Sequence, residues 1–191
     1  MTAVSTVILA GGLGTRIGGD KGLQHLHGKA LIDWVLEAIG KQSDEVLISA
    51  NANQTEYAAR GYRVIPDQFA EQAGPLAGLQ AALLLAHYDL IVCVPCDTPY
   101  LPRDLIARLS NVINSSSEAA VAVTDGQRQP TIALYRKDVL PKLDAYLNSG
   151  ARKVGDWLNT LCVNEVVFEN AVAFSNINSR DELMLANRDQ L

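Results

Sequence analysis

Apolar and polar positions alternate in blocks along the first 113 residues, and each block has the period of a strand or of a helix. Short apolar runs bounded by turn residues predict buried strands, whereas apolar residues at three- and four-residue intervals predict helices. The predicted strands are 6–10, 45–50, 62–65 and 89–94. The predicted helices are 30–41, 54–60, 76–87 and 103–113. This alternation indicates right-handed βαβ units and a largely parallel sheet.

The second part of the chain predicts a less regular arrangement. Two apolar runs, 119–124 and 131–135, flank the turn signal Asp125-Gly126 and predict an antiparallel pair. Ser179, with Glu182 three residues later, predicts a capped final helix. The other predicted elements are helices at 139–148 and 151–161, strands at 162–168 and 173–177, and a final helix to about residue 187. We therefore expect a three-layer α/β fold with a mostly parallel twisted sheet and a small antiparallel part in the second half.

A glycine-rich loop follows the first predicted strand. Six glycines stand between residues 11 and 22, with Arg16 and Lys21 among them. Glycine lets a ligand approach the backbone closely, and converging N–H groups bind anions. Ile17 breaks the dinucleotide-binding pattern, and Asp20 stands where a P-loop requires lysine. We interpret the stretch as a phosphate-binding loop of another kind; the alternative is a surface turn with incidental charges.

Polar residues follow the other predicted strands at the same edge of the sheet. Asn51 follows the second strand, Asp67 the third and Asp97 the central one. Ligands of such sheets bind at the carboxyl ends of the strands. Asp97 is the candidate Mg²⁺ ligand, because Mg²⁺ takes one or two carboxylates and adds water and substrate phosphates. We expect Asp67, which phosphates would repel, to contact ribose or base. Taken singly, each residue could instead end a strand or form a turn.

Charge and cysteine content narrow the possible functions. A net charge of −5 without a Lys/Arg run argues against a nucleic-acid groove. No apolar run approaches the roughly 20 residues that span a bilayer, and the N-terminus lacks a signal peptide's basic region, so we expect a cytoplasmic protein without a membrane partner.

Cys93 and Cys96 form a C-x-x-C pattern but lie on opposite faces of an extended chain. We interpret them as buried structural thiols rather than a redox or zinc site.

Five groups of residues, spread over nearly the whole chain, carry a family resemblance. They are Leu9-Ala10-Gly11-Gly12, Thr15-Arg16 with Gly19-Asp20-Lys21-Gly22, Gly74-Pro75-Leu76-Ala77-Gly78, Cys96-Asp97-Thr98-Pro99 and Asn176-Ile177-Asn178. In order and spacing they resemble the molybdenum cofactor guanylyltransferase family, which belongs to a larger group of nucleotidyltransferases with a Rossmann-like sheet. Ile17 stands where that family usually has methionine, and Gly14-Thr15-Arg16 is also similar to sugar-phosphate nucleotidyltransferases.

The resemblance implies a reaction and a division of labour. It implies a single nucleotidyltransferase domain over 1–191, with a nucleotide-binding half at 1–113 and an acceptor-binding half at 114–191. The reaction would transfer GMP from GTP to the phosphate of molybdopterin or the molybdenum cofactor and release pyrophosphate. Implied GTP contacts are Leu9, Ala10, Gly11, Gly12, Lys21, Asn51, Asp67 and Asp97, with Mg²⁺ on Asp97 and catalysis by Arg16, Lys21 and Asp97. Gly11 favours guanine, because relatives that use CTP tend to carry a second alanine there.

The acceptor side is predicted from weaker signals. Candidates for holding the pterin phosphate are Gly78, Arg152, Lys153, Asn176, Asn178 and the turn 125–131. Arg152-Lys153 could equally be a solvated helix face, and the two asparagines could be strand-end residues. Further partners would be proteins that deliver or receive the cofactor. The alternatives are a nucleotidyltransferase that uses CTP or another small phosphate acceptor, a non-catalytic GTP-binding module and, last, a thiol redox protein.

Overall fold

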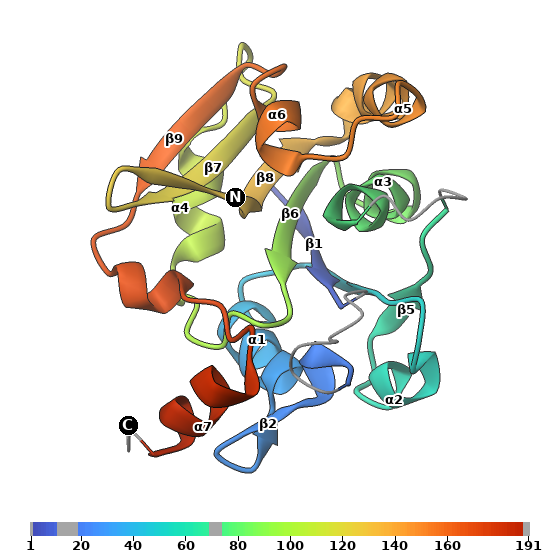
Figure 1. Ribbon diagram of the computed structural model, residues 1–191. Coiled ribbons are helices and arrows are strands. Elements are labelled where there is room, and N and C mark those ends of the chain that lie inside the picture. The colour runs from blue at the N-terminus through green and yellow to red at the C-terminus, as the bar shows by residue number, and fades with distance from the viewer. Residues whose placement is uncertain (1, 11–18, 69–73, 189–191) are drawn as a thin grey trace.

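The computed structural model describes residues 2–10, 19–68 and 74–188 (Figure 1). Within these residues a seven-stranded sheet has the order β5-β4-β1-β6-β8-β7-β9. The strands are β1 (Val4–Leu9), β4 (Glu45–Ser49), β5 (Arg63–Ile65), β6 (Leu90–Pro95), β7 (Ala119–Thr124), β8 (Gln127–Arg136) and β9 (Val163–Val167). All neighbouring pairs are parallel except those of β8, which runs antiparallel to β6 and β7. The prediction of a mostly parallel sheet with a small antiparallel part is confirmed.

Helices cover both faces of this sheet (Figure 1). They are α1 (Leu31–Ile39), α2 (Gln54–Ala58), α3 (Pro75–Leu85), α4 (Leu105–Val112), α5 (Leu140–Asn148), α6 (Val154–Leu158) and α7 (Arg180–Arg188). One apolar core lies between the sheet and α1, α2 and α4, and a second lies between the sheet and α3, α5 and α6. The three-layer prediction is therefore confirmed. No helix of the described residues has the length and hydropathy needed to cross a membrane.

The turn between β7 and β8 forms where the sequence predicted it. Asp125 and Gly126 have φ angles of 48° and 71°, which is the left-handed region that a tight hairpin turn requires. β8 begins at Gln127, four residues earlier than predicted, because Arg128 and Gln127 pair with Val123 and Thr124 across the turn. The antiparallel pair thus extends to the edge of the sheet where β1 and β6 end.

Two local predictions are wrong. The segment 173–177 is not a strand, because its first two residues belong to the 3-10 helix η3 (Ala171–Phe174). Ala173 and Phe174 bury their side chains in the apolar core without adding a strand to the sheet. A short hairpin, β2 (His25–Leu26) with β3 (Lys29–Ala30), was not predicted. Strands of two residues are too short to show an alternation of apolar and polar positions. The helical prediction for 151–161 is confirmed only at its centre, in α6.

The two cysteines of the C-x-x-C pattern pack in different cores. Cys93 belongs to the core under α3, whereas Cys96 belongs to the core under α1 and α4, and both thiols are free. Burial raises the pKa of the Cys93 thiol to about 12, so it stays protonated at neutral pH. The interpretation of both residues as buried structural thiols is confirmed.

Gly78 is the point where α3 packs against the ends of two strands. A Cβ atom added there would lie 2.5 Å from the Ser49 Oγ atom and 2.6 Å from the Leu9 Cδ2 atom. The Ser49 hydroxyl is hydrogen-bonded to Asp67, so it is not free to move away. Close helix–strand packing therefore explains why this position is glycine.

We predict that Gly78→Ala lowers the free energy of unfolding by about 1–3 kcal/mol, the usual cost of overpacking a core. The matched control is Gly155→Ala in α6, where an added Cβ meets no atom within 4 Å. That control is expected to be neutral or stabilising by up to about 1 kcal/mol, because alanine favours helix. Urea unfolding of both variants is the measurement. Equal stability of the two variants would contradict the packing argument.

Candidate active site

Three segments that are distant in sequence meet at the Lys21 ammonium. Lys21 begins the 3-10 helix η1 (Lys21–Leu23), Asp97 follows β6, and Asn178 precedes α7. The Lys21 Nζ atom lies 3.1 Å from Asp97 Oδ2 and donates a hydrogen bond of 2.8 Å to Asn178 Oδ1. The lysine side chain is 24% exposed, so it is partly accessible from the surface.

Asp97 carries a buried carboxylate oxygen that no other described residue contacts by a hydrogen bond. The residue is 6% exposed, and its Oδ1 atom has no hydrogen-bond partner among the described residues. A buried charged oxygen without a partner costs stability, which makes it a candidate for a ligand contact. Oδ2 is held by Lys21, so the orientation of the free oxygen is defined.

The donor set at Asp97 fits Mg²⁺. This ion prefers hard oxygen ligands and often takes only one or two carboxylates, with water and substrate phosphates completing its coordination. The described residues contain no group of three or more His, Cys, Asp or Glu side chains that could hold a metal. A metal at Asp97 would therefore depend on phosphate oxygens for much of its coordination, as Mg²⁺ does in nucleotide sites.

Asn51 and Asp67 meet beside the end of β4, as predicted from their places after two strands. The Asn51 Nδ2 atom donates to Asp67 Oδ2 at 2.7 Å, and the Asp67 backbone N–H donates to Asn51 Oδ1 at 2.9 Å. Ser49 donates to the other carboxylate oxygen of Asp67 at 3.2 Å. Asp67 is half-buried and Asn51 is exposed, so this rigid pair presents a carboxylate and an amide to the surface.

The segment before α7 is tied to the Asp97 turn. The Ile177 backbone N–H donates to the Asp97 carbonyl at 2.9 Å, and Thr98 Oγ1 donates to Asn176 Oδ1 at 2.6 Å. Asn176 and Asn178 lie in an irregular segment rather than at a strand end, and the Asn178 side chain reaches Lys21 while the Asn176 side chain reaches Thr98. Ser179 and Glu182 cap α7, but the Glu182 carboxylate accepts from the Asn178 N–H, one residue earlier than in a capping box.

The remaining predicted residues are spread over other places. Leu9 and Ala10 end β1, where the Leu9 carbonyl accepts from the Cys96 N–H and the Ala10 N–H donates to the Ser49 carbonyl. Arg152 donates to the carbonyls of Leu147 and Ala151 at the end of α5, and exposed Lys153 precedes α6. Gly11, Gly12 and Arg16 lie outside the described residues.

Sequence reasoning missed four residues that take part in this arrangement. They are Asp20, Ser49, Tyr57 and Thr98. Ser49 and Tyr57 lie within a predicted strand and a predicted helix. The sequence pattern of these elements does not show which residues their hydroxyl groups contact. Asp20 and Thr98 stand inside the motifs that carry the family resemblance, and that position was the available signal.

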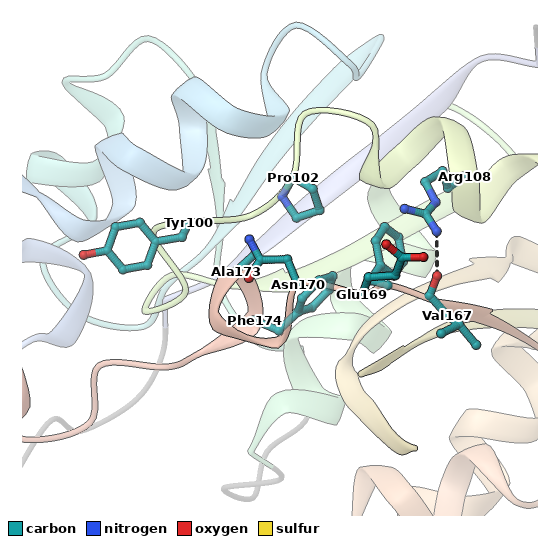
Figure 2. Close-up of a pocket in the computed structure, with 9 residues that line it drawn as sticks. Tyr100, Pro102, Arg108, Val167, Glu169, Asn170, Ala173 and Phe174 are labelled. Atoms are coloured by element: carbon teal, nitrogen blue, oxygen red, sulfur yellow. Dashed lines mark hydrogen bonds between the residues drawn. The ribbon is translucent and has the colours of Figure 1, made fainter. Parts of the chain in front are cut away.

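A separate hollow of about 580 Å³ lies between the segment after β6, α4 and the end of β9 (Figure 2). The Arg108 guanidinium lies 4.0 Å from the centre of the Phe168 ring and donates to the Val167 carbonyl at 2.5 Å. Arg108 thus joins α4 to the end of β9, as the dashed line in Figure 2 shows. None of the predicted site residues that the structure describes lines this hollow.

The fold is that of an α/β protein with its candidate site at the carboxyl ends of parallel strands, and the comparison with protein families identifies its class. Residues 6–163 match the family model described as the MobA-like NTP transferase domain. The chain therefore belongs to the MobA-like NTP transferase family, and it is a nucleotidyltransferase.

Curated relatives that align with nearly the full length of this chain share one name. Proteins from Cupriavidus metallidurans and Burkholderia ambifaria, both named molybdenum cofactor guanylyltransferase, are 42% and 45% identical to this chain. The alignments cover 94% and 95% of this chain, and 92% and 94% of the two relatives.

Solved structures agree with this assignment. Molybdopterin-guanine dinucleotide biosynthesis protein A from Archaeoglobus fulgidus is 26% identical with a TM-score of 0.80, over 96% of this chain and 97% of that chain. A 4-diphosphocytidyl-2C-methyl-D-erythritol synthase from Anaerococcus prevotii, 14% identical, has a TM-score of 0.75 over 98% of this chain and 95% of that chain. The second similarity shows a common fold only.

Proposed function

We propose that this nucleotidyltransferase transfers GMP from GTP to the terminal phosphate of molybdopterin or the molybdenum cofactor and releases pyrophosphate. The observation that carries the proposal is the convergence of Lys21, Asn178 and a buried Asp97 carboxylate, one oxygen of which has no hydrogen-bond partner in the described part of the chain. Such an arrangement suits phosphoryl transfer, because a cation stabilises phosphate charge and a carboxylate oxygen can hold Mg²⁺. The names of the full-length relatives support the choice of GTP and of a pterin acceptor.

The reaction requires positioning and charge stabilisation more than proton transfer. The attacking phosphate is largely ionised near neutral pH, so no general base is needed. Lys21 would stabilise charge on the triphosphate as pyrophosphate leaves, and Arg16 is proposed for the same task. Asp97 would hold Mg²⁺ through Oδ1, and the ion, when bound, would supply positive charge at the phosphates.

The base and ribose would be recognised at the end of β4. We propose that the Asp67 carboxylate accepts hydrogen bonds from donor groups of guanine or ribose. Asn51 and Ser49 hold that carboxylate in place. Leu9, Ala10, Gly11 and Gly12 would place the backbone of the β1 end against the nucleotide.

The acceptor would approach from residues of the second half of the chain. Asn176 and Asn178 are the stronger candidates for its phosphate, because they already contact the Asp97 turn and Lys21. Gly78, Arg152 and Lys153 remain predicted contacts. We further propose that the enzyme works in the cytoplasm, which its three free cysteines favour, and that it exchanges cofactor with delivery or target proteins.

The test is a panel of GTP, CTP, ATP and UTP with Mg²⁺ and molybdopterin, in which pyrophosphate release is measured. We expect kcat/KM for GTP to exceed that for the other nucleotides by about 10²-fold or more, because a site that hydrogen-bonds a base rejects those lacking its donors. Preferential use of CTP would overturn the base assignment. GTP binding in calorimetry without pyrophosphate release with any phosphate acceptor would instead indicate a non-catalytic module.

A further inference from the structure

Asp20, the residue before Lys21, is the centre of a hydrogen-bond cluster at the start of η1. Its Oδ1 atom accepts from the Gly22 N–H at 3.2 Å and from the Tyr57 hydroxyl, and its Oδ2 atom accepts from Asn53 Nδ2 at 3.0 Å. Asn53 and Tyr57 come from the start and the interior of α2. One carboxylate therefore joins α2 to the turn that carries Lys21.

The Tyr57 side chain is a rigid partner for this carboxylate. The residue is fully buried, and the Arg60 guanidinium lies 5.8 Å from the centre of its ring. Arg60 is in turn held by Asp33 of α1, at 2.5 Å. Burial and the hydrogen bond to Asp20 raise the pKa of Tyr57 far above its usual value, so its hydroxyl remains a donor at physiological pH.

The residue after Lys21 is held as closely as the residue before it. A Cβ atom at Gly22 would lie 2.5 Å from the Tyr57 hydroxyl and 3.3 Å from the Cys96 sulfur. The η1 turn is therefore seated between α2 and the residue that precedes Asp97. Lys21 has a flexible stem of four carbons, so the fixed backbone on both sides limits where its ammonium can lie.

We propose that Asp20 is a positioning residue: through Tyr57 and Asn53 it holds the η1 turn, so that the Lys21 ammonium stays against Asp97. The inference rests on the proposed function, because it assigns Lys21 a task in phosphoryl transfer. It also connects Lys21 with the Asn51–Asp67 pair, since α2 begins three residues after Asn51. Small displacements of a catalytic group cost rate steeply, which gives such a support a functional value.

The first experiment is Tyr57→Phe, which removes only the hydroxyl that Asp20 accepts. We expect kcat to fall by about 10-fold with KM for GTP within about twofold of wild type, because binding groups are kept while a charged group is misplaced. Asp20→Ala removes the acceptor of all three donors, so we expect a loss of about 10²-fold. The matched control is Tyr62→Phe, which removes a hydroxyl that makes no hydrogen bond within the described part of the chain. An unchanged kcat in Tyr57→Phe and Asp20→Ala would overturn the proposal.

A double-mutant cycle separates positioning from general stability. In a Lys21→Ala background, Tyr57→Phe is expected to cause no further loss of kcat, because the group it positions is absent. The same fold-loss in both backgrounds would indicate a merely structural role and would overturn the proposal.

Lysine labelling gives a readout that needs no acceptor substrate. Acetic anhydride should modify Lys21 severalfold faster in Tyr57→Phe than in wild type, measured by mass spectrometry against Lys142 as an internal reference. If wild type transfers no GMP but this labelling difference is found, the proposed function fails while the positioning role stands. Equal labelling of Lys21 in both proteins would overturn the positioning role.

Discussion

Asp97→Asn is expected to lower kcat/KM for GMP transfer by about 10³-fold or more, because it removes the charge that a phosphate-bound Mg²⁺ requires. The substitution keeps the size of the side chain, and the amide oxygen can still accept from Lys21. The carboxylate buries an oxygen that has no hydrogen-bond partner within residues 2–10, 19–68 and 74–188, so this oxygen adds little to the stability of the protein. We therefore expect the free energy of unfolding to change by less than about 1 kcal/mol.

The measurement is steady-state pyrophosphate release, together with calorimetry of Mg²⁺ binding in the presence of GTP. Asp104→Asn is the matched control, because this exposed carboxylate at the start of α4 makes a surface ion pair with Arg108, which contributes little to stability. It should leave both activity and Mg²⁺ binding at wild-type values. If Asp97→Asn transfers GMP at a rate close to wild type, Asp97 has no part in the mechanism.

Lys21→Ala is expected to lower kcat by about 10²–10³-fold, the usual cost of losing one group that stabilises transition-state charge. It also removes the charged partner of a carboxylate whose side chain is 9% exposed. We therefore expect a loss of about 1–3 kcal/mol in the free energy of unfolding, in contrast to Asp97→Asn. Lys21→Arg should recover stability more than activity, because a planar guanidinium does not reproduce the contacts of an ammonium with both Asp97 and Asn178.

The control for this prediction is Lys29→Ala. Lys29 makes its ion pair with Glu37 at the surface and lies over the Trp34 ring, away from Asp97. Its removal should leave kcat unchanged and cost at most about 1 kcal/mol. Losses of kcat that are equal in the two alanine variants would exclude a specific role for Lys21.

The sheet was predictable because its strands follow a strong local pattern. β1, β4 and β6 are short apolar runs that end at glycine, asparagine or proline, and burial on both faces of a parallel sheet requires such runs. The antiparallel β7–β8 pair was predictable for a different reason, because Asp125 and Gly126 tolerate the left-handed backbone of the turn. Local chemistry was sufficient in both cases.

The segment 173–177 was not predictable from its own residues. Its apolar residues resemble those of a strand, but a strand also requires a free neighbouring strand edge. The segment instead packs Phe174 against Phe168 and bonds its backbone at Ile177 to the Asp97 carbonyl. The second of these contacts depends on a residue that lies 80 positions away in the sequence (177 − 97).

Part of the candidate site followed from strand order. Asn51, Asp67 and Asp97 each follow a parallel strand, and parallel strands bring their carboxyl ends to one edge. The pairing of Asn51 with Asp67 and the closeness of Lys21 to Asp97 agree with that rule. The contact of Asp20 with Tyr57 did not follow from strand order. That rule places residues at strand ends, whereas Tyr57 lies in the helix α2.

The linear sequence determined the class of fold, the edge of the sheet where the polar residues gather and the residue types that suit a nucleotide and Mg²⁺. These features depend on local period, turn chemistry and the order of strands. Tertiary structure alone decided which Asp97 oxygen has no hydrogen-bond partner among the described residues. It also decided that Asn178 accepts a hydrogen bond from the Lys21 ammonium and that Asp20 accepts one from the Gly22 N–H next to Lys21. The physical reason is that burial and hydrogen-bond partners are properties of packed neighbours, which a linear pattern does not specify.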